Sequence, residues 1–278
     1  MKSLRNLYNY FNFLSLDVVL GAIAGMLFFA HVLRLTLKIE IIVILGLTVW
    51  IIYTLDHLMD VKKTNSQPNS PRHVFHFQNE KLLQLAVGII FLIVIILLIG
   101  LPSLYFLIIP GTILAGIIAC CLGVIYYFGK KIAFMKEFLI AAFYVLGITL
   151  APYALYENPI PTPFYALALL YFLVAWINLL ILSYLDKESD EKDGFDSVVN
   201  WIAPKNLKVL ILSFGSLGII FSLYLYLSQM SYFHIYTSVL LLMLLIHIIY
   251  FLDKKCPKET TRKILEASFL LPFLVLLF

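Results

Sequence analysis

Apolar residues run through the sequence in long stretches that short polar segments separate. Each stretch favours an α-helix of about 20 residues, the length that crosses a hydrocarbon layer of about 30 Å at 1.5 Å per residue. Nine candidate spans follow, at residues 16–34, 39–59, 82–101, 104–127, 138–156, 163–185, 208–228, 232–252 and 264–278. The pattern therefore predicts an all-α, polytopic membrane protein that lies in a lipid bilayer.

The composition leads to the same class and excludes others. Of the 278 residues, 62% are hydrophobic and only 13% are charged, and a water-soluble protein of this size could not bury so much apolar surface. The net charge of +4 is spread over short clusters between apolar runs, so no basic face is expected and nucleic acid is excluded as a partner. The three cysteines are odd in number, which excludes a disulfide-stapled secreted module.

The Lys and Arg residues predict the orientation in the membrane. Eighteen of the 20 lie at the amino terminus or after spans two, four, six and eight, and only Arg34 and Lys38 lie elsewhere. Cytoplasmic loops carry the excess of basic residues, so the amino terminus and these four connections are expected in the cytoplasm. We expect a bacterial inner membrane, with the carboxyl terminus outside.

Two pairs of aspartates close two of the spans on the predicted cytoplasmic side. Asp56 and Asp60 end the second span, and Asp186 and Asp190 end the sixth. Each i,i+4 spacing places both carboxylates on one helix face, where they repel each other unless a cation compensates. Mg²⁺ is typically held by one or two carboxylates together with phosphate oxygens of a substrate. The pairs therefore predict a Mg²⁺ site that binds a diphosphate, with these four aspartates as the catalytic residues.

Basic residues near the pairs are candidate ligands of the diphosphate. Arg72 follows the first pair, and a guanidinium can hold phosphate oxygens bidentately. Lys130, Lys131 and Lys136 follow the fourth span on the same predicted side. Lysines are also the usual residues of a cytoplasmic interface, so Arg72 is the preferred candidate.

Other polar residues are weaker candidates. Asp193 either extends the metal-binding acids or simply solvates its loop, and Asn178, about two turns before the second pair, is a candidate for lining a cavity. Asp17 is interpreted as a helix N-terminal acid that the helix dipole favours. Packing or hydrogen bonding is the expected role of the six histidines, because a carboxylate-rich Mg²⁺ site does not need imidazole.

Over nearly its whole length, the chain resembles the UbiA superfamily of intramembrane prenyltransferases. The resemblance is carried by Asp56-x-x-x-Asp60 with Arg72, by Asp186-x-x-x-Asp190, and by Tyr126 followed by Lys130 and Lys131. It implies one domain over residues 1–278, with nine transmembrane helices around a central cavity that Tyr126 helps to line. Ile52 and Tyr53 stand where the family's first motif has Asn and Asp, which indicates a divergent branch.

The resemblance implies transfer of a prenyl group from an isoprenyl diphosphate to an aromatic or other lipophilic acceptor. Cations near the diphosphate would stabilise the charge that develops on the leaving group. A transporter or a non-catalytic scaffold with a degenerate diphosphate site is the first alternative, although acids at helix ends favour metal chemistry over transport. A CDP-alcohol phosphotransferase is the second, because Asp190-Glu-Lys-Asp193-Gly194 matches the first half of that signature.

Overall fold

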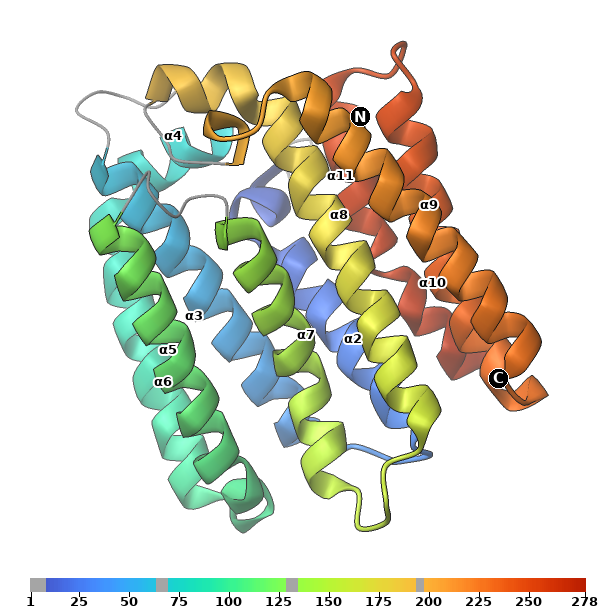
Figure 1. The fold of residues 1–278 in the computed structure, drawn as a ribbon. Coiled ribbons are helices and arrows are strands. Elements are labelled where there is room, and N and C mark those ends of the chain that lie inside the picture. Colours follow the sequence, from blue (N-terminus) through green and yellow to red (C-terminus); the bar gives the residue numbers. More distant parts are fainter. Residues whose placement is uncertain (1–8, 64–69, 129–134, 194–197) are drawn as a thin grey trace.

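The chain folds into a bundle of long helices that run between two ends (Figure 1). The computed structural model describes residues 9–63, 70–128, 135–193 and 198–278. The long helices are α2 (Leu16–Val32), α3 (Ile39–Lys63), α5 (Glu80–Gly100), α6 (Tyr105–Phe128), α7 (Lys136–Leu155), α8 (Thr162–Asp193), α9 (Pro204–Ser228) and α10 (His234–Leu252). The shorter elements are α4 (Pro71–Gln78), α11 (Lys258–Ser268) and the 3-10 segments η1 (Pro102–Leu104), η3 (Val198–Asn200), η4 (Ser231–Phe233) and η5 (Leu271–Leu277). No strand occurs in these described ranges, so the all-α prediction is confirmed.

The count of nine spans is not confirmed. Within the described residues, seven helices are long and apolar enough to cross a membrane, namely α3, α5, α6, α7, α8, α9 and α10. Helix α2 is also apolar but has only 17 residues. The expected ninth span is divided between α11 and η5. Helix α11 begins at Lys258 with charged residues and ends at Ser268, and Pro272 cannot donate the backbone N–H that would continue the helix.

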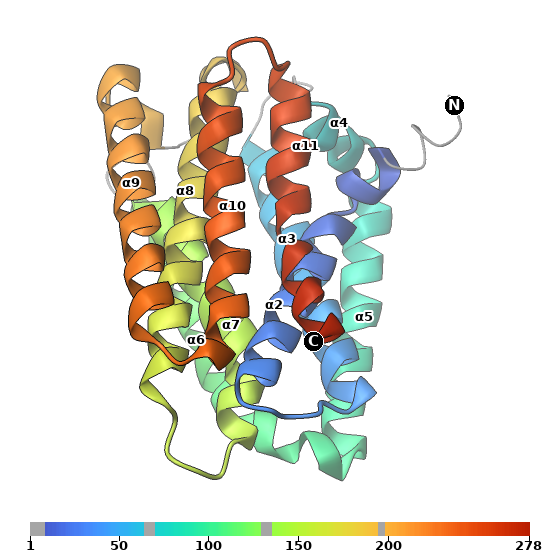
Figure 2. The same ribbon diagram turned by 90° about the vertical axis from the view of Figure 1, so that its right-hand side faces the viewer.

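Helix α8 lies at the centre of the bundle. It packs against α7, α9 and α10. In its apolar stretch 56% of the residues are buried, compared with 17% in that of α5. Helices α5 and α6 lie on one side of the bundle and α9 and α10 on the other, with α2 and α7 between them (Figures 1 and 2). This arrangement leaves α5 to face lipid and makes α8 the scaffold on which the second aspartate pair is carried.

Aromatic rings form the contact between α2 and the centre of the bundle. Phe28 and Phe29 are fully buried, and their ring centroids lie 6.0 and 5.8 Å from that of Tyr171 on α8. Gly25, one turn earlier on α2, allows this approach, because a Cβ atom there would lie 2.9 Å from Tyr171 Oη and 2.7 Å from Ile148 Cδ1. Small residues serve the same purpose wherever membrane helices pack closely.

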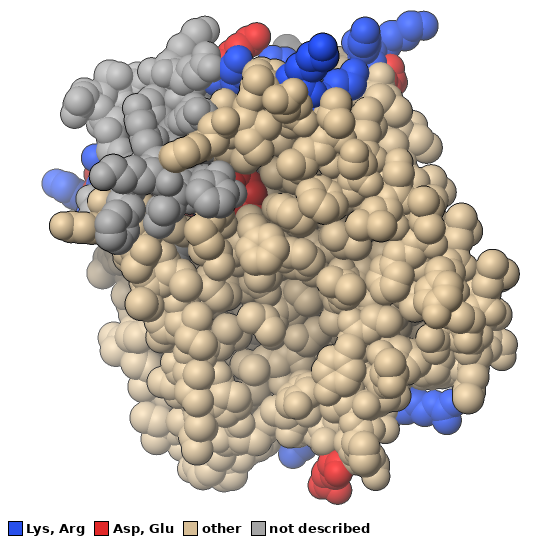
Figure 3. Space-filling model, viewed as in Figure 1, with Lys and Arg blue, Asp and Glu red and all other residues tan. Residues whose placement is uncertain are grey.

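Charged side chains gather at the two ends of the bundle, and the surface between them is largely uncharged (Figure 3). One end carries helix α4, the last turns of α3 and α8, and the first turns of α7 and α11 (Figure 1). We call it the aspartate end, because Asp56, Asp60 and Asp186 lie there on α3 and α8. An apolar belt between two charged ends is the form expected of a membrane protein.

The packing of α2 makes a prediction about stability. Gly25→Val should lower the free energy of unfolding by about 1–3 kcal/mol, because the added side chain overpacks the contact with Tyr171. Thermal unfolding of the purified protein in detergent measures the change. Gly88→Val on α5 is the matched control, because a Cβ atom there meets nothing within 4 Å. Equal melting temperatures for the two variants would contradict the close approach.

Candidate functional site

The first aspartate pair lies in the last turns of α3 and contacts a lysine from α7. Lys136 Nζ lies 3.6 Å from Asp60 Oδ2 and 3.9 Å from Asp56 Oδ1. All three side chains are only partly buried, so small ions can reach them. The ammonium group supplies the positive charge that two carboxylates one turn apart require. Lys136, a predicted diphosphate ligand, is thus placed directly beside the predicted metal ligands.

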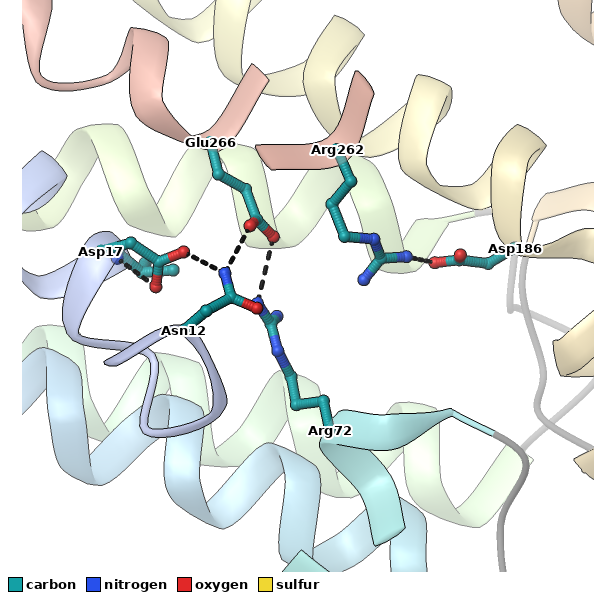
Figure 4. Close-up of polar contacts among 7 residues, drawn as sticks. Asn12, Asp17, Arg72, Asp186, Arg262 and Glu266 are labelled. Atoms are coloured by element: carbon teal, nitrogen blue, oxygen red, sulfur yellow. Dashed lines mark hydrogen bonds and ion pairs between the residues drawn. The ribbon is translucent and has the colours of Figure 1, made fainter. Parts of the chain in front are cut away.

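The second pair lies in the last turns of α8, where Asp186 forms an ion pair with Arg262 of α11 (Figure 4). Burial alone would disfavour the charged guanidinium, but the carboxylates of Asp186 and Glu266 outweigh it and raise the pKa of Arg262. Arg262 therefore stays cationic and neutralises the acid at the end of α8. This partnership could not be predicted from the sequence, because Arg262 is one of several basic residues after the eighth span.

Several predicted site residues fall where side chains are not described. Asp190 and Asp193 lie in the last turns of α8 and Tyr126 lies near the end of α6, but their side chains are outside the described part of the structure. Lys130 and Lys131 lie outside the described residues altogether. Their roles stay predictions.

Arg72 lies in a buried polar cluster with Asn12, Asp17 and Glu266 (Figure 4). Arg72 Nη2 donates to Asn12 Oδ1 at 2.9 Å and lies 3.2 Å from Glu266 Oε1. Asn12 Nδ2 donates to Asp17 Oδ2 at 2.6 Å and to Glu266 Oε2 at 2.8 Å. The preferred diphosphate candidate is therefore already engaged within the protein, where it joins α4 to α11.

The buried polar cluster gives Asp17 a larger role than that of a helix N-terminal acid. Its Oδ1 accepts the backbone N–H of Val18 at 3.0 Å, as an acid in the first turn does, but its Oδ2 accepts from Asn12. The clue in the sequence was an ionisable residue beside an apolar run, a position at which acids are rare unless they have a partner. Sequence reasoning missed Asn12 and Glu266 because they lie at opposite ends of the chain.

Helix α7 connects the two motif helices. Lys136 contacts α3, whereas the next residue, Glu137, accepts the hydroxyl hydrogen of Ser183 at 2.8 Å and the backbone N–H of Val198 at 3.0 Å. Ser183 lies one turn before Asp186 on α8. Glu137 is buried, and sequence reasoning did not select it. Together with α11, these contacts hold the ends of α3 and α8 at the same end of the bundle.

Asn178 lies inside the bundle and does not face lipid. Its Oδ1 lies 3.3 Å from His247 Nε2, and the other ring nitrogen of His247 lies 2.8 Å from the carbonyl oxygen of Met243. Both side chains are buried between α8 and α10. Hydrogen bonding is therefore the role that this histidine has in the structure, and Asn178 lies beside its second ring nitrogen.

Three histidines pack together near the first pair. The ring centroid of His57 lies 4.8 Å from that of His76 and 5.6 Å from that of His73. Burial lowers the pKa of His76, which keeps the ring neutral near pH 7. In the described residues no group of three or more His, Cys, Asp or Glu could hold a metal ion.

The first pair nevertheless has the donor chemistry of a Mg²⁺ site. Carboxylate oxygens of Asp56 and Asp60 already converge on one cation, the Lys136 ammonium group, at 3.9 and 3.6 Å. Two carboxylates are the number that Mg²⁺ typically takes from protein when phosphate oxygens complete its ligands. The residues therefore fit Mg²⁺ together with a phosphate-bearing ligand, and not a metal site made of protein alone.

The chain matches the model of a known protein family. The model of the UbiA prenyltransferase family matches residues 18–271, which include α3, α8 and both aspartate pairs. The searches of curated proteins and of solved structures found no match. The match covers most of the chain and includes Arg262 and Glu266 on α11 as well as the motif helices.

The buried polar cluster makes a prediction about stability. Glu266→Gln should lower the free energy of unfolding by about 3–5 kcal/mol, because it leaves the Arg72 charge buried without its ion-pair partner. The double variant Arg72→Gln/Glu266→Gln should cost less than the sum of the two single variants, since the partners are then lost together. Chemical denaturation followed by tryptophan fluorescence measures both effects.

The exposed pair Lys258–Glu188 provides the control. Its side chains are 60% and 78% exposed, so Lys258→Gln and Glu188→Gln should each change the stability by no more than about 1 kcal/mol. Additive losses for Arg72 and Glu266, of the same size as those of the control pair, would show that the cluster is not coupled.

Proposed function

The chain belongs to the UbiA prenyltransferase family, and from this premise we propose that it transfers a prenyl group from an isoprenyl diphosphate to an aromatic or other lipophilic acceptor within the membrane. The observation that carries the proposal is that two aspartate-bearing helix ends lie at the same end of the bundle, each beside a basic side chain. Asp60 lies 3.6 Å from Lys136, and Asp186 pairs with Arg262. Carboxylates and cationic side chains in this arrangement can together bind metal ions and the phosphate groups of a ligand.

We propose that four aspartates bind Mg²⁺ and that lysines bind the diphosphate. Asp56, Asp60, Asp186 and Asp190 are the proposed metal ligands, with Asp193 as a further one. Bound Mg²⁺ would supply positive charge that neutralises the diphosphate as the leaving group forms. Lys136, together with Lys130 and Lys131, would donate hydrogen bonds to the phosphate oxygens. Arg72 would add positive charge at the same end while it anchors α11 through Glu266.

In the proposed reaction the bond between the allylic carbon and the diphosphate oxygen breaks, and its electron pair leaves with the diphosphate. Lys136 stabilises the charge that develops on that oxygen. A nucleophilic carbon of the acceptor then bonds to the allylic carbon and loses its proton to the released diphosphate. The faces of aromatic rings can stabilise an allylic cation. Tyr144, Tyr171 and Phe269 pack together with ring centroids 5.8 to 6.2 Å apart, beside the part of α2 that lies one to two turns after Asp17.

One observation supports a second candidate function, that of a non-catalytic scaffold with a degenerate diphosphate site. Lys136 and Arg262 already lie beside acids of both motifs, so Asp56, Asp60 and Asp186 have cationic partners without any ligand. Such a protein would bind neither Mg²⁺ nor a diphosphate with useful affinity. Membership of the UbiA family gives no support to a CDP-alcohol phosphotransferase.

Binding of a prenyl diphosphate tests the proposed site. The full chain, purified in detergent, should bind farnesyl diphosphate with Mg²⁺ and lose the binding when the metal is chelated. Asp60→Asn and Asp190→Asn should each weaken the binding at least tenfold, because each removes a carboxylate from a proposed metal site. Isothermal titration calorimetry measures the affinity.

Asp253→Asn is the matched control for these variants. Asp253 follows α10 in an exposed position and accepts the backbone N–H of Lys255, so its loss should leave the affinity unchanged. Metal-independent binding, or unchanged affinity in both Asp60→Asn and Asp190→Asn, would refute the proposed site. Absence of any binding by the unmodified chain would favour the scaffold.

We also propose that the aspartate end faces the cytoplasm. The support is the excess of basic residues at that end, against Arg34 and Lys38 at the other. In a variant with all three cysteines replaced by Ala, Lys38→Cys should react with a membrane-impermeant maleimide in intact cells. Lys254→Cys should react only after the membrane is opened. Both positions are exposed, so the reversed pattern would overturn the orientation.

A further inference from the structure

Arg262 is a basic residue beside the second aspartate pair, and the proposed reaction assigns it no role. It lies on α11, pairs with Asp186 of the second motif, and keeps 19% of its side chain exposed, while Asp186 keeps 33%. The pair is therefore accessible to a small ion, unlike the pair formed by Arg72 and Glu266, whose side chains are 12% and 7% exposed. An accessible guanidinium beside a proposed metal ligand can contact a ligand that binds at the second aspartate pair.

Arg262 is held in this position by its own helix. Glu266 lies one turn further along α11 and is fixed by Arg72 of α4 and by Asn12. The carboxylate of Glu266 also acts electrostatically on Arg262 from within the same helix. Helix α11 is thus anchored by the buried polar cluster, and Arg262 is presented at the end of α8 (Figure 4). A guanidinium fixed in this way loses little conformational freedom when it binds a phosphate group.

Arg262 and a Mg²⁺ ion would compete for the same carboxylate, that of Asp186. Two cations on one carboxylate repel each other, so Arg262 in its observed place opposes the binding of Mg²⁺ alone. An anion between the two cations removes the conflict, and a diphosphate is an anion with oxygens for both. The planar fork of an arginine matches phosphate oxygens bidentately.

We propose that Arg262 is a further diphosphate-binding residue, which pairs with Asp186 in the substrate-free protein and with the diphosphate when the site is filled. The inference rests on the proposed function, because it requires the same Mg²⁺ and diphosphate site. The exchange of partners by Arg262 also makes the binding of metal and diphosphate mutually dependent. Diphosphate draws Arg262 away from Asp186, which frees the carboxylate for Mg²⁺, and Mg²⁺ on Asp186 frees Arg262 for the diphosphate; the two ligands are therefore positively coupled. Free Mg²⁺ then binds weakly, and the metal enters together with the diphosphate.

The test uses the full chain in detergent with MgCl₂ and inorganic pyrophosphate as probes. Arg262→Gln should bind Mg²⁺ alone at least threefold more tightly, because the competing cation is gone. The same variant should bind pyrophosphate in the presence of Mg²⁺ at least tenfold more weakly. Lys258→Gln is the matched control, because it removes one positive charge from the exposed start of the same helix, and both affinities should stay within twofold of the unmodified chain. Isothermal titration calorimetry measures both affinities.

A merely structural arginine would give a different result. Arg262→Gln would then weaken both ligands together, in step with its melting temperature in Mg²⁺-free buffer, and this outcome overturns the proposal. Arg262→Lys keeps the charge and guards against a folding defect. Its affinity for Mg²⁺ alone should stay within twofold, while loss of the bidentate fork lowers pyrophosphate affinity about threefold; unchanged pyrophosphate affinity in both variants also overturns the proposal.

Pyrophosphate binding by the unmodified chain and by Arg262→Gln distinguishes an error in the role of Arg262 from an error in the proposed function. If the unmodified chain binds pyrophosphate with Mg²⁺ and Arg262→Gln binds it equally well, only the role of Arg262 is wrong. If the unmodified chain binds no pyrophosphate at any Mg²⁺ concentration, both are wrong.

Discussion

Charge at the end of an apolar bundle has to be paired, and the aspartate end is organised around this requirement. An ionised side chain that loses water without gaining a partner costs several kcal/mol, so acids near the membrane are stabilised by cations or by hydrogen-bond donors. Four of the described acids that are not exposed have a cation as partner. Asp56 and Asp60 share Lys136, Asp186 has Arg262, and Glu266 has Arg72. Each of these pairs joins two different helices, so neutralising the acids also fixes the geometry of this end.

The pairs join elements that the chain itself does not bring together. Helix α7 reaches α3 through Lys136 and α8 through Glu137, while α11 reaches α8 through Arg262 and α4 through Glu266. The two aspartate motifs are thus connected directly through α7, whereas α11 connects the second motif to α4, which packs against α3. A rigid frame of this kind is what a site needs when two sets of ligands must act on one small anion. It also explains why short, polar α11 is part of the bundle even though it is not itself an apolar span.

Internal ion pairs and a metal–diphosphate site are compatible for a physical reason. A carboxylate that is neutralised by a flexible or exposed cation can exchange that partner for a metal, whereas one that is fully buried cannot do so without a large cost. At the aspartate end the two kinds of pair are separated. The pairs of Lys136 and Arg262 are partly exposed, whereas Asn12, Asp17 and Glu266 are buried and the side chain of Arg72 is 12% exposed. The buried polar cluster holds the helices in place, and the exposed pairs are free to change partners.

Local patterns in the sequence are enough to predict the class of fold and the positions of the main helices. Long apolar runs and helical spacing are local properties, so they located α3 and α8 and showed that Asp56 and Asp60 share a helix face. Only the tertiary structure decided which charges meet. Asp186 and Arg262 are 76 residues apart, Arg72 and Glu266 are 194, and Asn12 and Glu266 are 254. It also divided the expected ninth span into a polar helix and a 3-10 segment. Partners at such separations depend on how whole helices pack, and a single sequence carries no local signal for that packing.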